Sequence, residues 1–215
     1  MIRTRNFLRR YTDLPTLIQM LRDRAVTFLD PNLWDDKNDA YFMELYKDKK
    51  KLKTLLALCC SEATETYHHW RVFSGGPSGV CVSFQRNALM KHLTSPSVRH
   101  GEVKYLKIKD LQGPAHAVDD LPFIKRSPYE PECEFRFIYQ SRTEQVHLKS
   151  FDISLACIDS ITLSPWMPGL VAESVRSHLK DIWGTSRLRV KRSTLVSNEQ
   201  WRDCGDEIVR REARG

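Results

Sequence analysis

Apolar residues recur at helical spacing in five stretches of the chain. The first stretch begins after Thr12 or Asp13, either of which can cap a helix, and it has Pro15 in its first turn. One face of each stretch then carries an apolar residue every three or four positions, as an amphipathic helix requires. The predicted helices cover residues 14–21, 41–46, 67–73, 88–93 and 170–182, and the second continues into a lysine-rich stretch.

Short apolar runs, some of them alternating with polar residues, predict the strands. In residues 79–84, for example, Val80, Val82 and Phe84 fall on one face of an extended chain. We expect this strand to pair with residues 103–107. The other predicted strands cover residues 25–29, 56–60, 135–139, 157–163 and 188–190.

Strands and helices follow one another without the regular alternation of a βαβ sheet. The sequence therefore predicts an α+β fold, with a mixed, largely antiparallel sheet and helices packed on it. Polar or proline-containing connections separate the elements, and the longest of them is a candidate lid or substrate loop. The predicted loops cover residues 35–39, 94–101 and 111–129.

The composition indicates one globular domain. Hydrophobic residues make up 41% and charged residues 28% of the 215 residues, and no Gly/Ser-rich or Pro-rich linker divides the chain. We expect a single α+β domain over residues 1–203 and a polar C-terminal tail over residues 204–215. No apolar run approaches the roughly 20 residues that span a bilayer, and the N-terminal stretch lacks the apolar segment of a signal peptide. A cytoplasmic protein without membrane contact is expected.

Residue types that bind metals occur at the wrong spacing. The polar residues 35–39 lack the glycine and the distal glutamate of a calcium-binding loop. His68 and His69 are adjacent, so on a helix they point about 100° apart and cannot chelate one ion. The six cysteines contain no CxxC pair and are predicted to be reduced packing residues. No metal site is predicted.

The charge balance suits a polyanionic partner. The formal net charge is +7 and the pI is about 9.1, and neutralising phosphates with Lys and Arg releases counterions from nucleic acid. Solvated faces of surface elements would explain the same basic runs. The candidate contacts for nucleic acid are Lys47, Lys49, Lys50, Lys51, Arg187, Arg189, Lys191 and Arg192.

An acidic run at the start of a predicted strand is the strongest candidate for chemistry. Glu132, Glu134 and Arg136 alternate, so all three would project from one face of an extended backbone. A solvent-facing ladder, with the arginine paired to a glutamate, is one interpretation. The other is an active site, because Pro128 and Pro131 stiffen the approach and paired carboxylates can divide binding and proton transfer between them.

Several segments together resemble a bacterial family, catalogued as domain of unknown function 2971. The resemblance extends in order over roughly residues 9 to 197. The sequence departs from the family pattern at Cys60, Ala40 and His69, where phenylalanine, proline and methionine are usual. The matching segments are Arg10-Tyr11, residues 28–39, Cys59-Cys60-Ser61-Glu62, His69-Trp70, residues 78–84, Lys125 with Glu132-x-Glu134-x-Arg136, and Ile158-x-x-Ile161-x-Leu163-x-Pro165.

The layout of that family is similar to ADP-ribosyltransferases, which implies an ADP-ribosyltransferase-like fold and NAD as co-substrate. By this resemblance Arg10 and Tyr11 would lie near the phosphates or ribose of NAD, and Ser61 near the nicotinamide ribose. Glu134 would be the catalytic residue and Glu132 would assist the acceptor. The residues expected to support the site are Arg136, Trp70 and Asn38.

Three functions therefore remain open. The first is an NAD-dependent ADP-ribosyltransferase-like enzyme, a toxin or phage-defence effector that acts on nucleic acid or a nucleic-acid-associated protein and is held by an antitoxin or regulatory protein. The second is a non-catalytic nucleic-acid-binding or adaptor module. The third is a metal-dependent nuclease that uses Glu132, Glu134 and Lys125 with Asp35 or Asp39. The first function requires Glu134, Arg10 and Ser61 to line one cleft.

Overall fold

A computed structural model describes residues 6–113, 115–182 and 188–212 of the chain. Strands and helices alternate irregularly along it. The strands are β1 (Phe7–Asp13), β2 (Ala25–Leu29), β3 (Thr54–Ser61), β4 (Gly79–Gln85), β5 (Val98–Glu102), β6 (Lys104–Leu106), β7 (Ile124–Arg126), β8 (Glu134–Ser141), β9 (Leu148–Asp152), β10 (Ile158–Leu163) and β11 (Arg189–Arg192). The helices are α1 (Leu14–Asp23), α2 (Lys37–Lys49), α3 (Tyr67–Phe73), α4 (Arg86–His92), α5 (Ile108–Leu111), α6 (Gly169–Asp181) and α7 (Glu199–Glu212).

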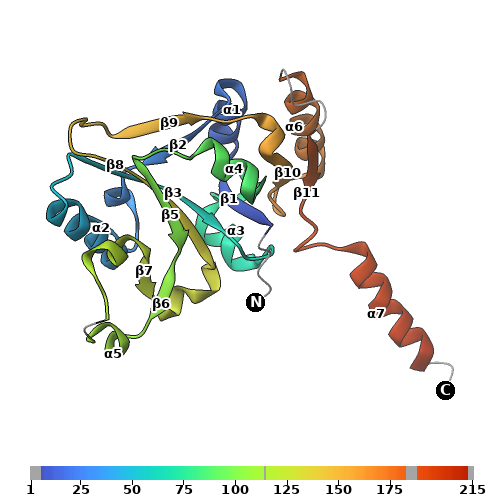
Figure 1. The fold of residues 1–215 in the computed structure, drawn as a ribbon. Helices are drawn as coiled ribbons and strands as arrows, with labels where there is room; N and C mark the ends of the chain where they lie inside the picture. Colours follow the sequence, from blue (N-terminus) through green and yellow to red (C-terminus); the bar gives the residue numbers. More distant parts are fainter. Residues whose placement is uncertain (1–5, 114, 183–187, 213–215) are drawn as a thin grey trace.

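A nine-stranded sheet, counted within the described residues, forms the centre of the molecule (Figure 1). Its strand order is β11-β10-β4-β1-β3-β2-β9, and β8 lies between β3 and β5. In this sheet β10 and β11 are parallel and the other pairs are antiparallel. Helices pack on the sheet, so the predicted α+β fold class, with its mixed, largely antiparallel sheet, is confirmed.

One face of the sheet carries the main hydrophobic core. Alternate residues of each strand point to this face, among them Leu8, Val82 and Phe137, which are fully buried. The helices α1, α4 and α6 cover the core with their apolar residues. Helix α1 begins as predicted, because the side chain of Asp13 accepts a hydrogen bond from the amide of Thr16 at 2.9 Å.

The opposite face carries a smaller core and most of the polar side chains. Helix α2 covers β3 and β8 with Met43 and Tyr46, which pack around Ile138. Helix α3 lies over β1, where Trp70 packs edge-on against Tyr11 at 5.2 Å between ring centroids. The two helices leave the sheet uncovered between them, and the candidate site lies there.

The sheet divides between β1 and β3. These two strands are bridged at a single pair, Arg9 with Ser61, whereas β1 pairs with β4 along its length and β3 pairs with β8 along its length. Arginine side chains of β1 replace part of the missing ladder. Arg9 Nη1 donates to the carbonyl oxygen of Ala63 at 2.8 Å, and Arg10 Nη1 donates to that of Cys59 at 3.3 Å. The divergence turns the middle of the sheet into a cleft.

Two predictions about the strands are wrong. Residues 79–84 form β4, but β4 pairs with β1 and β10, whereas residues 104–106 pair in parallel with β7. Residues 98–102, expected in a loop, form β5 on the edge of β8. Local alternation identifies a strand but not its partner strand. Strand β4 is buried on both faces, which is typical of a central strand with two partners.

Two predicted loops are partly regular. In the stretch 35–39, Asp36 caps α2: its Oδ1 accepts from the amides of Asn38 and Asp39 at 3.0 and 3.4 Å, and the helix begins at Lys37. Residues 111–129 contain β7 and two 3₁₀ turns, of which the second, η4 (Ser127–Glu132), leads into β8. From residue 118 onward, this predicted irregular loop therefore contains regular elements up to the acidic run.

Helix α7 extends away from the body of the molecule (Figure 1). It runs through residue 203, where the sequence placed the start of a polar tail, and it has no buried residue. No helix among the described residues has the length and apolar character needed to cross a membrane. All six cysteines are free thiols, and Cys60, Cys81, Cys133 and Cys157 are buried as predicted.

Candidate functional site

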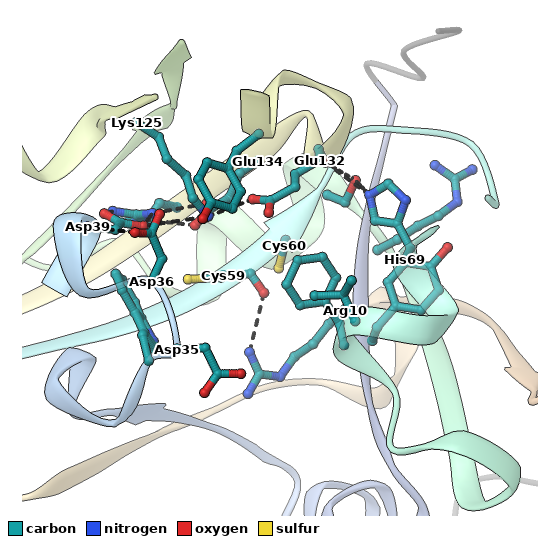
Figure 2. Close-up of a pocket in the computed structure, with 18 of the residues that line it drawn as sticks. Arg10, Asp35, Asp36, Asp39, Cys59, Cys60, His69, Lys125, Glu132 and Glu134 are labelled. Atoms are coloured by element: carbon teal, nitrogen blue, oxygen red, sulfur yellow. Dashed lines mark hydrogen bonds and ion pairs between the residues drawn. The ribbon is translucent and has the colours of Figure 1, made fainter. Parts of the chain in front are cut away.

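A cleft of about 470 Å³ opens on the polar face of the sheet, above the divergence of β1 and β3. This volume is in the range of pockets that hold small ligands. Figure 2 shows Asp39, Glu132 and Glu134 gathered around Lys125 on one side of the cleft, and Arg10 on the other side, where Asp35 is drawn beside it. The residues that line it are Arg9, Arg10, Tyr11, Leu33, Trp34, Asp35, Asp36, Asp39, Cys59, Cys60, Ser61, His69, Val72, Phe73, Lys125, Tyr129, Glu132, Glu134 and Arg136.

Arg136 holds one end of the cleft together from a fully buried position. Its Nε and Nη2 donate to the two carboxylate oxygens of Glu134 at 2.8 and 2.9 Å, and Nη1 and Nη2 donate to those of Asp39 at 2.9 and 2.7 Å. Nη1 also donates to the carbonyl oxygen of Pro122 at 2.8 Å, and the indole of Trp34 lies 4.6 Å from the guanidinium carbon. A buried cation is tolerated here because its donors are satisfied.

Lys125 joins three carboxylates. Its ammonium lies 2.7 Å from Oε2 of Glu132 and 3.6 Å from an oxygen of both Glu134 and Asp39. The ring of Tyr129 packs against the same ammonium at 4.7 Å from its centroid. Two cations, Lys125 and Arg136, therefore neutralise most of the acidic charge at this end of the cleft.

The two glutamates of the acidic run have opposite pKa shifts. Burial alone would raise the pKa of Glu134, but the charge and hydrogen bonds of Arg136, with the charge of Lys125, outweigh burial and lower this pKa to about 2. Burial raises the pKa of Glu132, and the charge of Lys125 only partly offsets it. Two carboxylates whose pKa values are pushed apart can take different roles.

Glu132 does not lie on the strand, so the prediction of three charges on one extended face is wrong for this residue. Cys133 has left-handed backbone angles, φ 44° and ψ 51°, and it ends η4 before β8 begins. Glu134 and Arg136 alone share the strand face. The turn brings the Glu132 carboxylate in from the side, toward Lys125.

Hydrogen bonds from β3 and α3 fix that turn. The hydroxyl of Ser61 donates to the carbonyl oxygen of Glu132 at 2.6 Å, and His69 Nε2 lies 3.1 Å from the same oxygen and 3.0 Å from Ser61 Oγ. The hydroxyl of Thr66 bonds the other ring nitrogen at 2.5 Å, and burial lowers the pKa of His69. A neutral imidazole with its proton on Nε2 satisfies every one of these contacts. Ser61 thus acts on the site through the position of Glu132.

The side of the cleft opposite Glu132 and Glu134 carries Arg10 and aromatic side chains. Arg10 makes one hydrogen bond, to the backbone of Cys59, and no carboxylate of the described residues lies within ion-pair distance of it. Tyr11 stacks on the imidazole of His69 at 5.2 Å between centroids. Phe73 is 40% exposed at the rim of the cleft. An anionic group and a flat ring would both find partners here.

The predicted site residues mostly meet in this cleft. Arg10, Tyr11, Ser61, Glu132, Glu134 and Arg136 all line it. Trp70 is a fully buried residue of α3 that donates from Nε1 to Glu65 at 2.6 Å, and it does not line the cleft. Asn38 is exposed on α2 and does not line the cleft, and its side chain donates to Asp36, which does. The neighbouring Asp39 points to Arg136 instead.

Sequence reasoning missed three residues that hold the carboxylates. The sequence predicts Asp39 in a loop, it gives Asp39 and Lys125 a role only in the nuclease alternative, and it assigns no role to His69. The signal for Asp39 was its position three residues after a capping aspartate, which places it on the first turn of a helix.

The cluster differs from a site for a divalent cation. A group of three His, Cys, Asp or Glu side chains arranged to hold a metal is not found among residues 6–113, 115–182 and 188–212. The carboxylates of Asp39, Glu132 and Glu134 converge, but the ammonium of Lys125 lies where their oxygens meet.

The sequence matches no known protein-family model and no curated protein. The resemblance to the family of unknown function therefore stays a prediction. Solved structures of Thermus sp. 2.9 DarT are similar to this chain. The complex of DarT with NAD+ has 14% identity and a TM-score of 0.47, over 87% of this chain and 95% of that chain. The complex with carba-NAD+ has 14% identity and a TM-score of 0.44 over the same shares, and the complex with ADP-ribosylated ssDNA has 13% identity and a TM-score of 0.47 over 87% and 94%.

Proposed function

We propose that this protein is an NAD-dependent ADP-ribosyltransferase-like enzyme. The observation that carries the proposal is that Arg10, Ser61 and Glu134, far apart in the sequence, line one cleft. The cleft combines a cation that forms no ion pair with the described residues, aromatic side chains and two carboxylates with divergent pKa values. A dinucleotide contains the matching groups: a pyrophosphate, flat rings and ribose hydroxyls.

NAD supplies an activated ribose: the bond to nicotinamide breaks, nicotinamide leaves, and the nucleophile of an acceptor bonds to the anomeric carbon. Arg10 would hold the pyrophosphate. Glu134 stays ionised through its low pKa, and although both its oxygens accept from Arg136, each has a lone pair left for a ribose hydroxyl. Its negative charge would stabilise the oxocarbenium-like transition state.

Glu132 would accept the proton of the acceptor. Its raised pKa brings it closer to the working range of a general base. Its Oε2 accepts a hydrogen bond from Lys125, while Oε1 receives none from any described residue, and the residue lines the cleft. The backbone of Glu132 is fixed by Ser61 and His69, so the carboxylate is held in place without being blocked.

Release of nicotinamide from NAD tests the proposal. Glu134→Gln should lower turnover by about 10²-fold or more, and Glu132→Gln should lower transfer to an acceptor by a similar factor, because a positioned charge or base is lost. Glu130→Gln is the matched control, since Glu130 is exposed on the same turn. If Glu134→Gln turns over NAD as fast as the parent, the assignment is wrong.

The finer parts of the proposal concern the acceptor and the biological setting. The acceptor would be nucleic acid or a nucleic-acid-associated protein, and the enzyme would serve as a toxin or phage-defence effector with an antitoxin or regulatory partner. A metal-dependent nuclease fits the cleft less well, because Lys125 and Arg136 already fill the coordination space of the carboxylates. In a non-catalytic nucleic-acid-binding module, the divergent pKa values of the two glutamates would have no functional role.

A further inference from the structure

A second concavity, of about 420 Å³, lies on the same face of the sheet on the other side of α3. Its floor is the uncovered face of β1, β4, β10 and β11. We call it the β11 groove. It is lined by Phe7, Arg9, Glu65, Trp70, Cys81, Ser83, Asp159, Ser160, Thr162, Arg189 and Lys191.

Strand register places polar residues of the groove in rows. One row crosses the four strands as Arg9, Ser83, Ser160 and Arg189, each paired with the next. The row beside it ends in Thr162 paired with Lys191. With strands about 4.8 Å apart, each row spans about 14 Å from β1 to β11. Hydroxyls in the middle and cations at the ends thus form a strip across the sheet.

The acidic residues of the groove are already engaged. Asp159 accepts from Arg189 at 2.5 Å and from the hydroxyl of Ser160 at 3.0 Å. Glu65 accepts from the side chains of Trp70 and Ser193. They therefore offset part of the basic charge without projecting free carboxylates into the groove.

The groove retains donors for a ligand. Lys191 is exposed, and its ammonium makes no ion pair with any residue that the structure describes. The hydroxyls of Ser83 and Thr162 likewise have no hydrogen-bonding partner among residues 6–113, 115–182 and 188–212. An ammonium with hydroxyls on the same strip suits phosphate oxygens.

The groove and the cleft are neighbours on the sheet. Arg9 lines both, and α3 stands between them, with His69 facing the cleft and Trp70 facing the groove. An extended ligand on the strip would therefore arrive at the side of Glu132 and Glu134 where an acceptor is needed.

We propose that the β11 groove binds the backbone of a single-stranded nucleic acid and guides it to the cleft. A concave cationic strip with an aromatic side chain at one end, here Phe7, is the form of site that binds single strands, whereas duplexes are read by a projecting helix or ribbon. The guiding role rests on the proposed function, but binding itself does not.

The two predicted basic groups separate in the structure. Lys47, Lys49, Lys50 and Lys51 lie at the end of α2, on the opposite side of the molecule from β11 (Figure 1), and Lys50 pairs with Asp119 at 2.8 Å. Arg187 lies outside the described residues. Arg192 donates to the carbonyl oxygen of Pro165 at 2.8 Å and lies on the other face of β11. Of these residues, Arg189 and Lys191 line the groove.

Fluorescence anisotropy with labelled dU12 and U12, two oligonucleotides that differ only in the 2′-hydroxyl of the sugar, tests the proposal without NAD. Lys191→Glu should weaken binding of the preferred oligonucleotide about tenfold and flatten its salt dependence. Thr162→Val should weaken it less. Lys49→Glu is the control, because it makes the same charge change on an exposed residue at the far side and should leave binding unchanged. The tighter of the two oligonucleotides identifies the sugar of the ligand.

Three results would overturn the proposed binding site. The first is no binding of either oligonucleotide, and the second is an equal loss of affinity in Lys49→Glu and Lys191→Glu. The third is equally tight binding of poly-glutamate, which would indicate a general anion-binding surface. These results are separable from failure of the proposed function. Oligonucleotide binding without nicotinamide release would leave the groove standing and reject the transferase. Nicotinamide release that depends on Glu134, without oligonucleotide binding, would do the reverse.

Discussion

Among single residues, Arg136 both stabilises the buried end of the cleft and fixes the position of Glu134. A fully buried guanidinium is unstable without partners, and Asp39, Glu134 and a backbone carbonyl supply them. The same contacts fix the orientation of Glu134 and keep it ionised. Arg136 is therefore a positioning residue, and its first effect is on folding.

Replacement of Arg136 by Met should destabilise the fold by about 3–5 kcal/mol, because Asp39 and Glu134 would stay buried without their main counter-charge. Urea unfolding measures the change. Arg22→Met, on the exposed surface of α1, is the control and should stay within about 0.5 kcal/mol of the parent. Asp39→Asn combined with Arg136→Met should cost less than the sum of the two single changes, and strict additivity would contradict the coupling.

The low pKa of Glu134 predicts how stability depends on pH. Its folded-state pKa of about 2 lies below the ordinary 4.5, so the stabilisation from its charge is complete above about pH 4.5 and is lost as the pH falls toward 2. The raised pKa of Glu132 acts in the opposite direction, favouring the folded state as the pH falls through that pKa.

Urea unfolding at several pH values should therefore show the free energy of unfolding falling below about pH 4.5 in the parent. The decline should be less steep in Glu134→Gln, which is also less stable at neutral pH because Arg136 loses a charged partner. An equally steep acid decline in this variant would mean that Glu134 is not held ionised by the fold.

At the level of elements, the start of α2 controls the site more than its sequence suggests. The polar residues 35–39 predict a loop, yet Asp36 caps α2 and places Asp39 in the first turn of the helix. By fixing the start of α2, the cap positions Asp39 to accept a hydrogen bond from the buried Arg136.

Asp36→Ala should lower the free energy of unfolding by about 0.5–2 kcal/mol, since two amides at the start of α2 lose their acceptor. Asp35→Ala is a close control, because Asp35 is exposed and caps no amide in the structure. Chemical denaturation of both variants measures the difference. A loss as large in Asp35→Ala would show that charge, and not the cap, is responsible.

The elements also show how far sequence reasoning reaches. Periodicity located α1, α3 and α6 and most strands, because apolar spacing reports which side of an element is buried. It misjudged the partner of β4, since pairing is set by contacts between distant segments. The cleft shows the same limit. The charged residues next to Glu134 in the sequence identify it as a candidate, whereas Lys125 and His69 reach the site through tertiary contacts that local sequence does not predict.

At the scale of the whole molecule, one face of the sheet provides stability and the other carries the candidate sites. The face under α1, α4 and α6 holds the main core, and the opposite face holds both concavities. Because β1 and β3 meet at one residue pair, the cleft opens without breaking the core on the other side. Helix α7 extends from the body with no buried residue, and its Trp201 and Ile208 are exposed.

A chain ending at Asn198 should consequently keep the stability of the parent within about 0.5 kcal/mol, because α7 contributes no buried residue and a lone helix of its length is marginal in water. Thermal and urea unfolding measure this, and nicotinamide release should persist. A chain ending at Ile182 also lacks β11, which pairs with β10, and should be clearly less stable. If the Asn198 truncation is itself strongly destabilised, α7 packs against the body in solution, and the division of the molecule into two faces and a separate helix is wrong.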